Sequence, residues 1–195
     1  MVWNEMLKHD IPAGWGDIPI GELCICHDSK RIPLSNKQRE TMKGTIPYYG
    51  ATGIMDYVND AIFEGDYLLL AEDGSIMTKQ GTPILQTING KTWVNNHAHV
   101  LSAKNRWSTR FLQLHFSEIP VRKIKTGSIQ PKITKENLFA YRVLKIPESI
   151  LTLADELFGK TQKLADEAQK EMLQLVKLRD WLLPMLMNGQ VEVTG

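Results

Sequence analysis

Residues 149–188 read SILTLADELFGKTQKLADEAQKEMLQLVKLRDWLLPMLMN, and this stretch decides the fold. It holds one glycine, Gly159, and no proline before Pro184, so nothing interrupts a helix over most of its length. Apolar residues recur in steps of three and four, or multiples of seven, which predicts a long helix with a coiled-coil face. A helix of about 40 residues extends about 60 Å. That is longer than a compact domain of this size needs.

Two apolar rows run along the predicted helix. The first row consists of Ile150, Ala154, Leu157, Leu164, Ala168, Leu175, Leu178, Leu182 and Met185. The second row consists of Leu151, Phe158, Ala165, Met172, Val176 and Leu183. Together they make the apolar face broad enough to bury against another helix and something else as well. An ordinary surface helix of a globular protein is the alternative, but length and heptad regularity count against it.

The remaining residues predict a body of mixed secondary structure. The expected strands cover 18–26, 54–59, 67–71, 83–88, 92–101 and 139–146. Asn89-Gly90 is a strong hairpin signal between two of them. Trp107–Phe116 predicts a helix capped by Ser108 or Thr109, and residues 1–10 predict a short helix or a frayed start. The fold class is therefore α+β: a globular domain of short strands and helices (1–147) followed by a long coiled-coil helix (148–195).

Composition limits the classes of function. The 195 residues are 43% hydrophobic and 23% charged, which suits one globular domain plus an extension. The net charge of +1 predicts that any nucleic-acid site is a local basic patch. The only cysteines, Cys24 and Cys26, are expected to be reduced thiols. Residues 1–10 lack the apolar segment of a signal peptide, and no stretch approaches a membrane span. We expect a cytoplasmic protein.

Signatures of catalysis are missing from the sequence. It has no glycine-rich cofactor turn after the first strand, no Asn/Asp-Pro-Pro-aromatic motif of a base-modifying methyltransferase, and no phosphate-binding Gly-x-x-x-x-Gly-Lys-Ser/Thr. Glu72 and Asp73 are adjacent and predict an acidic turn rather than a pair of catalytic carboxylates. We assign no catalytic residue and expect a protein that is not an enzyme.

A metal-dependent enzyme remains an alternative because His97 and His99 are expected on one strand face. Cys24, Cys26 or His27 would have to supply further ligands. The spacing of these residues matches no standard zinc pattern. A packing or hydrogen-bonding role is favoured for both histidines, and no metal ligand is assigned.

Two stretches combine basic residues with hydrogen-bonding side chains. Residues 123–132, reading KIKTGSIQPK, place lysines beside a serine and a glutamine. Lysines and backbone N–H groups hold phosphates, whereas serine and glutamine side chains can contact base edges. Lys37, Arg39, Lys43, Tyr48, Tyr49 and Thr52 form a second set of the same character. Solvated loops are the alternative.

Several motifs, in this order along the chain, resemble the specificity (S) subunits of type I restriction–modification systems. They are Ile11–Trp15 (IPAGW), Ile46–Gly53 (IPYYGATG), Leu70–Gly74 (LAEDG), Trp93–Val100 (WVNNHAHV), Gly127–Ile133 (GSIQPKI), and Leu178–Leu182 (LRDWL), which leads to Leu186 and Gly189-Gln-Val191. Each motif is weak alone, but their order over nearly the whole chain is specific.

This resemblance implies a target recognition domain that reads one half of a bipartite DNA sequence. It also implies a helix that spaces two such domains and docks methyltransferase subunits. The partner methyltransferase would use S-adenosylmethionine, this chain would bind no cofactor, and the restriction subunit would be reached indirectly. The expected DNA-binding residues are Lys37, Arg39, Lys43, Tyr48, Tyr49, Thr52, Arg122, Lys123, Lys125, Ser128, Gln130 and Lys132.

A full-length member has two recognition domains and two antiparallel helices, whereas this chain resembles one half. The apolar stripe then needs a second helix, and another copy of the chain is the simplest source. The expected homodimer interface consists of Leu157, Leu164, Ala168, Leu175, Leu178 and Leu182. Such a dimer would recognise an inverted repeat with a gap. A coiled-coil interaction scaffold without sequence-specific DNA binding is the alternative.

Overall fold

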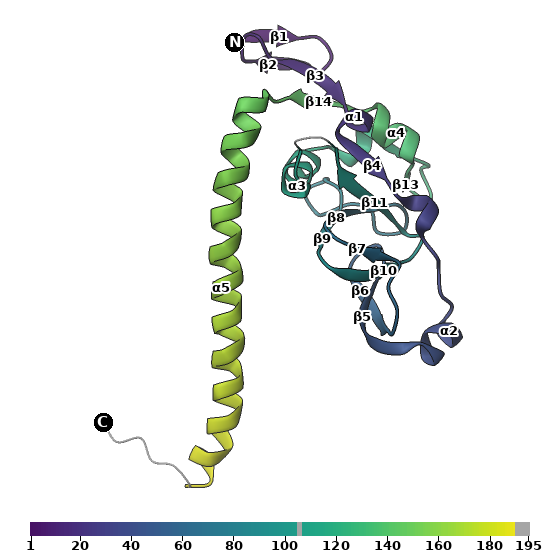
Figure 1. The fold of residues 1–195 in the computed structure, drawn as a ribbon. Coiled ribbons are helices and arrows are strands. Elements are labelled where there is room, and N and C mark those ends of the chain that lie inside the picture. The colour runs from purple at the N-terminus through teal and green to yellow at the C-terminus, as the bar shows by residue number, and fades with distance from the viewer. Residues whose placement is uncertain (105–106, 190–195) are drawn as a thin grey trace. The chain divides into compact units, whose positions relative to one another are not determined.

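The computed structural model describes residues 1–104 and 107–189 (Figure 1). The chain forms two compact units, Met1–Leu151 and Thr152–Gly195. The first unit contains the strands and short helices, and the described part of the second consists almost entirely of one long helix. The mixed α+β class predicted from the sequence is confirmed.

Among the described residues of the first unit, the largest sheets are two of four strands each. One has the order β6-β5-β10-β7 and the other β4-β11-β8-β9. The strands of the first sheet are β5 (Lys43–Tyr49), β6 (Ile54–Val58), β7 (Phe63–Glu64) and β10 (Lys91–Val94). Those of the second are β4 (Cys24–Cys26), β8 (Tyr67–Ala71), β9 (Leu85–Ile88) and β11 (Ala98–Ala103). Strands β10 and β5 pair in parallel, and the other pairs within these sheets are antiparallel.

Smaller ladders and short helices complete this unit. The two-stranded ladders are β1 (Val2–Asn4) with β2 (His9–Ile11), β3 (Gly16–Pro19) with β14 (Arg142–Lys145), and β12 (Lys125–Thr126) with β13 (Lys132–Ile133). The helices are α1 (Ile20–Leu23), α2 (Asn36–Thr41), α3 (Thr109–Ser117) and α4 (Lys135–Ala140), with 3-10 turns η1 (Asp28–Lys30) and η2 (Val121–Lys123).

Strand β8 forms the centre of the core. Its residues Leu68, Leu69, Leu70 and Ala71 are fully buried because both faces of the strand are covered. Leu68 and Leu70 belong to the main apolar cluster, whereas Leu69 belongs to a second one. This alternation follows from the two-residue period of a strand. The continuous apolar run in the sequence therefore predicted a buried strand correctly.

The segments 63–71 and 85–94 pass together from one sheet into the other. Strand β7 pairs with β10 and β8 pairs with β9, all antiparallel. Between the two ladders, Gly65 and Gly90 exchange backbone hydrogen bonds, and both have positive φ angles. Asn89 and Gly90 therefore lie where segment 85–94 bends from one sheet into the other, and the predicted hairpin is wrong. Strands β9 and β10 belong to different sheets, and each pairs with segment 63–71 instead.

Other boundaries also differ from the prediction. The expected strand at 18–26 is broken by helix α1, and the expected strand at 92–101 divides into β10 and β11. The first residues form the β1–β2 hairpin rather than a helix. For β10 and β11 the pairing partners, which lie elsewhere in the chain, decide where each strand begins and ends.

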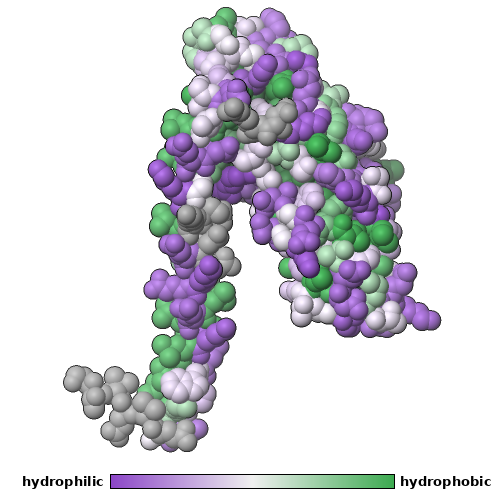
Figure 2. Space-filling model, viewed as in Figure 1, coloured by the Kyte–Doolittle hydropathy of each residue, from purple (hydrophilic) through white to green (hydrophobic). Residues whose placement is uncertain are grey.

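Two helix predictions are confirmed. Helix α3 begins after Ser108, whose Oγ accepts a hydrogen bond from the backbone N–H of Phe111. Helix α5 spans Glu148–Met187 and continues through Pro184. Large apolar side chains are exposed along α5, and Figure 2 shows them between hydrophilic residues. No helix among the described residues is long and apolar enough to cross a membrane.

Candidate nucleic-acid interface

The β12–β13 hairpin carries the first of the two candidate binding stretches. Lys125 pairs with Ile133 and Thr126 with Lys132, and residues 127–131 form the loop between the strands. Gly127 has a φ of 75°, and a Cβ there would lie 2.6 Å from the carbonyl oxygen of Gln130. Only glycine fits this turn without strain. The loop therefore presents Ser128 and Gln130 to solvent in a defined turn.

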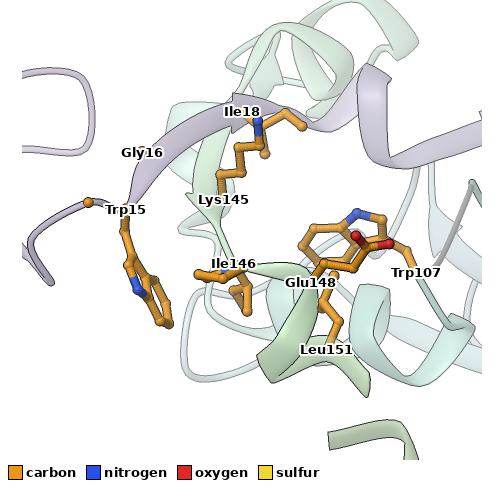
Figure 3. Close-up of a pocket in the computed structure, with 10 residues that line it drawn as sticks. Trp15, Gly16, Ile18, Trp107, Lys145, Ile146, Glu148 and Leu151 are labelled. Carbon is orange, nitrogen blue, oxygen red and sulfur yellow. The ribbon is translucent and has the colours of Figure 1, made fainter. Parts of the chain in front are cut away.

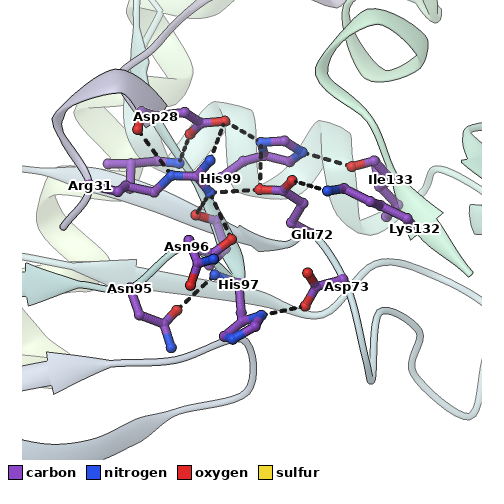
Figure 4. Close-up of polar contacts among 12 residues, drawn as sticks. Asp28, Arg31, Glu72, Asp73, Asn95, Asn96, His97, His99, Lys132 and Ile133 are labelled. Carbon is purple, nitrogen blue, oxygen red and sulfur yellow. Dashed lines mark hydrogen bonds and ion pairs between the residues drawn. The ribbon is translucent and has the colours of Figure 1, made fainter. Parts of the chain in front are cut away.

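Strand β13 is attached to the end of β8. The backbone N–H of Ile133 donates a 2.9 Å hydrogen bond to the carbonyl oxygen of Glu72, and the Ile133 side chain is fully buried. Lys132 Nζ lies 2.7 Å from Glu72 Oε1 (Figure 4). The base of the hairpin is thus held by main-chain and side-chain contacts with one residue, while its loop remains exposed.

Glu72 is a buried carboxylate with two cationic partners. Besides Lys132, Arg31 places Nη1 2.7 Å from Glu72 Oε2 and donates from the same nitrogen to the carbonyl oxygen of Ala98. Burial opposes ionisation of Glu72, but the hydrogen bonds from Lys132 and Arg31 outweigh it and hold its pKa below the usual value. The predicted acidic turn at Glu72 is therefore a structural ion-pair site.

His99 lies next to Glu72 and is 2% exposed. Its Nδ1 is 2.5 Å from Asp28 Oδ2, and its Nε2 is 2.8 Å from the carbonyl oxygen of Ile133. A carbonyl oxygen only accepts hydrogen bonds, so Nε2 must carry a hydrogen. Burial alone would lower the pKa of His99, but hydrogen bonds with Asp28 and Cys26, the charge of Asp28 and the Ile133 carbonyl raise it to about 10. The ring is therefore an imidazolium that donates from both nitrogens.

The protonation state of His99 decides whether this residue can bind a metal ion, as a metal-dependent enzyme would require. Among the described residues, Cys26, Asp28 and His99 form the one group of three close enough for a shared ion. Both nitrogens of His99 already donate hydrogen bonds, so neither has a free lone pair for a metal. His97 lies outside β11 and places Nδ1 2.6 Å from Asp73 Oδ1. The expected shared strand face of the two histidines is therefore wrong.

The basic residues near the hairpin differ in their partners. Arg122, Lys123 and Lys125 are exposed on η2 and β12. Lys132 is 46% exposed at its side chain, but the ion pair with Glu72 already neutralises its charge. The cations most available to an anionic partner are thus those that precede the loop.

The second candidate set lies on α2, β5 and the turn after β5, apart from β13 in the first unit (Figure 1). Lys37 and Thr52 are exposed and Tyr49 is half-buried. Arg39 and Lys43 both pair with Asp56, at 3.1 and 2.7 Å. These ion pairs lower the pKa of Asp56 to about 2, with the hydrogen bond from Lys43 as the largest cause.

The structure corrects the prediction for Tyr48. Its side chain is 1% exposed and packs with Leu34, Val58 and Trp93. Its hydroxyl oxygen accepts a hydrogen bond from the backbone N–H of Leu34. Residues alternate between faces along β5, so Tyr48 points into the core. It is therefore a packing residue and cannot contact bases from this position.

The residues that hold the hairpin could not be grouped from the sequence. Asp28, Arg31, Glu72 and His99 are separated by up to 71 positions along the chain. One signal was present: Glu72 ends a continuous apolar run, where a buried carboxylate requires cationic partners.

A pocket of about 530 Å³ lies elsewhere in the first unit (Figure 3). Its walls include Trp15, Trp107 and Leu151, with Lys145 and Glu148 at its border. Trp107 also makes edge-to-face contacts with Phe111 and His115 of α3. The aromatic walls favour an apolar side chain as occupant, and no predicted DNA-binding residue lines the pocket.

Three comparisons relate the chain to known proteins. The family model described as the type I restriction modification DNA specificity domain matches residues 12–149. The type I restriction enzyme specificity subunit S.HindORF215P of Haemophilus influenzae is 32% identical over 149 residues, which cover 74% of this chain and 38% of that protein.

Among solved structures, the S subunit of a type I restriction–modification system from M. genitalium superposes with a TM-score of 0.64 at 12% identity. The match covers 92% of this chain and 46% of that one. The chain therefore spans less than half the length of these relatives. The family model covers most of the chain, including the hairpin and the ion network described above, and we conclude that the chain belongs to the type I restriction–modification DNA specificity family.

Proposed function

We propose that this chain is a DNA-recognition module that reads one half of a gapped DNA target. The family match over residues 12–149 carries this proposal, because it covers nearly the whole unit that presents the hairpin loop. The exposed cations Arg122, Lys123 and Lys125 are suited to bind phosphates. Ser128 and Gln130 in the loop are suited to contact base edges.

The candidate residues on α2, β5 and the turn after β5 contribute fewer free contacts to the proposed DNA interface. Lys37, Tyr49 and Thr52 retain some exposure and are assigned to the DNA interface. The cations Arg39, Lys43 and Lys132 have carboxylate partners, so they contact phosphates only by sharing or exchanging those partners.

Helix α5 is assigned to dimerisation and to docking of methyltransferase subunits. Leu157, Leu164, Leu175 and Leu178 are all between 48% and 66% exposed, so the first apolar row is available to a second helix. Antiparallel pairing of two copies through Leu157, Leu164, Ala168, Leu175, Leu178 and Leu182 would give two identical readers. These readers would recognise an inverted repeat whose gap is set by helix length.

In this proposal the chain itself is not catalytic and binds no cofactor. The methyltransferase subunit supplies S-adenosylmethionine chemistry, and the restriction subunit is reached through it. DNA and the methyltransferase are partners found in the cytoplasm, where we place the complex.

Selection from a randomised duplex library tests this function. The purified chain is mixed with the methyltransferase subunit of its system, and bound duplexes are recovered and sequenced. We expect two inverted half-sites with a fixed gap. Affinity for the selected duplex should fall with salt, with a log–log slope of about 0.9 per phosphate contact. Binding that is independent of both sequence and salt would contradict the proposal.

A coiled-coil scaffold is the second candidate, favoured by the exposed apolar side chains of α5. The two functions respond differently to substitution. In a scaffold, Arg122→Glu with Lys125→Glu leaves partner binding and activity of the assembly intact. In a DNA reader, the same double substitution abolishes DNA binding while the assembly with the methyltransferase subunit persists.

A further inference from the structure

Four segments far apart in the sequence meet at the base of the β12–β13 hairpin. The first is η1, which contains Asp28 and is followed by Arg31, and the second is the end of β8, which is followed by Glu72. The other two are strand β11 with His99 and strand β13 with Lys132 and Ile133 (Figure 4). His99 is the side chain that joins them, because its two ring nitrogens contact Asp28 and the Ile133 carbonyl. Its Nδ1 also lies 3.8 Å from Glu72 Oε2.

We infer that His99 is a positioning residue for DNA recognition: as a donor from both ring nitrogens it fixes strand β13, and thereby the conformation of loop 127–131. This inference deepens the proposed function and rests on it. His99 itself is buried and contacts no DNA in this scheme.

The loop needs this support because few contacts within the hairpin hold its tip in place. The β12–β13 ladder contains two residue pairs, and Ile129 at the tip is 94% exposed. Isolated ladders of this size are not stable in water. The conformation of the loop is therefore set at its base, where Ile133 is buried and bonded to both Glu72 and His99. A loop fixed before binding loses less conformational entropy when it meets DNA.

The charged groups around His99 explain why both of its ring nitrogens donate hydrogen bonds. Asp28 and Glu72 are the anions next to it, Arg31 and Lys132 are the cations that pair with those carboxylates, and Cys26 on β4 lies beside the ring. Removing one member leaves a buried charge or carbonyl with one partner fewer, which is costly in a low-dielectric interior. The network thus specifies one geometry for β13.

In this scheme Lys132 holds Glu72 and contacts no DNA phosphate, in place of the shared phosphate contact proposed above. A lysine that binds a DNA phosphate contributes about one unit to the salt dependence of binding. A lysine that holds Glu72 contributes to affinity through loop geometry and leaves that slope unchanged. Lys132→Arg preserves the cation and should retain binding, whereas Lys132→Met should weaken it at constant slope.

The first experiment measures the hairpin directly. Amide hydrogen exchange of the full chain is compared for wild type, His99→Gln and Glu72→Gln. Glu72→Gln keeps the shape of the side chain and serves if His99→Gln fails to fold. We expect exchange of residues 125–133 to accelerate by at least about tenfold, since a charge-assisted hydrogen bond is lost. The amides of β8 and α3 should keep their protection. Unchanged exchange in the hairpin of a folded variant overturns the inference.

The second experiment measures binding of the duplex recovered by selection, in the presence of the methyltransferase subunit. We expect His99→Gln to weaken binding by about tenfold with an unchanged salt slope. His97→Gln is the matched control, because His97 is exposed, pairs with Asp73 and lies outside the network. It should bind as wild type does.

The two experiments separate this inference from the proposed function. A loosened hairpin with unchanged DNA binding overturns the positioning role but leaves DNA recognition standing. Wild-type protein that selects no DNA sequence refutes the proposed function, and the role in recognition falls with it. Equal losses for His97→Gln and His99→Gln also overturn the inference, because they show a contribution that does not depend on the network.

Discussion

His99 carries its positive charge inside the protein because three groups surround it: the Asp28 carboxylate, the Ile133 carbonyl oxygen and the Glu72 carboxylate. A buried histidine without them would be neutral, since burial disfavours the charged form. The energetic consequence is a dependence of stability on pH. The folded state binds a proton that the unfolded state releases near the ordinary histidine pKa of about 6.5.

The first prediction concerns this dependence. The pKa of His99 is raised to about 10 in the folded state, so its stabilisation is complete below about pH 6.5 and is lost as pH rises towards 10. Urea unfolding between pH 7 and 8.5 should show the free energy of unfolding falling by up to about 1.4 kcal/mol per pH unit. This range stays below the ordinary pKa of the Cys24 thiol, which burial raises to about 12.

His99→Gln should be less stable at pH 7 and should lose most of this slope. His97→Gln should retain it. A wild-type protein whose stability is flat over this range would show that His99 is neutral in solution.

A second prediction concerns Gly127. Alanine at this position would have a φ of 75° and a Cβ 2.6 Å from the Gln130 carbonyl oxygen. The backbone must move, at a local cost of about 1–2 kcal/mol. We expect Gly127→Ala to weaken binding of the selected duplex by about tenfold with a small change in melting temperature. Gly159→Ala meets no atom within 4 Å and should leave binding unchanged. Full binding by Gly127→Ala would show that this turn is not needed for recognition.

At the scale of elements, α5 differs from the short helices of the body. Helix α3 buries Leu112 and Phe116 against the core, so its apolar residues have a partner within the chain. Helix α5 has the same kind of periodicity, but most of its large apolar side chains are exposed. The proposed pairing with a second helix would bury that face.

A third prediction follows for the apolar row of α5. Leu164→Asp or Leu175→Asp places a charge on a face proposed to pair with a second helix, and burial of an unpaired charge is strongly unfavourable. Sedimentation velocity should show loss of the dimer while circular dichroism retains the helical signal. Lys177→Asp, a charged position outside the row, is the control and should remain dimeric. A dimer that survives both leucine substitutions would place the interface elsewhere.

At the scale of the whole molecule, the proposed architecture predicts a mass. Light scattering at micromolar concentration should give twice the chain mass of 22.2 kDa. The reason is that two-fold pairing buries the same apolar row on both copies. A mass of 22.2 kDa at this concentration would contradict self-pairing.

Local patterns were sufficient where short-range physics decides the structure. Helix α5 was predictable because its period of three and four residues is written in consecutive positions, and β8 because its run of apolar residues requires burial on both faces. Ser108 was predictable as a cap because its hydroxyl bonds three residues ahead.

The tertiary structure decided what depends on distant partners. Asn89-Gly90 signals a turn, but only the opposing Gly65 shows that the strands on either side enter different sheets. Tyr48 has the composition of a base-contacting residue, yet the register of β5 points it into the core. The link between Asp28 and His99 spans 71 positions, so no local pattern encodes it. The sequence by itself therefore determined the long helix, the central strand and the family. Only the folded chain decided which charged groups hold the loop, because ion pairs form between residues that folding brings together.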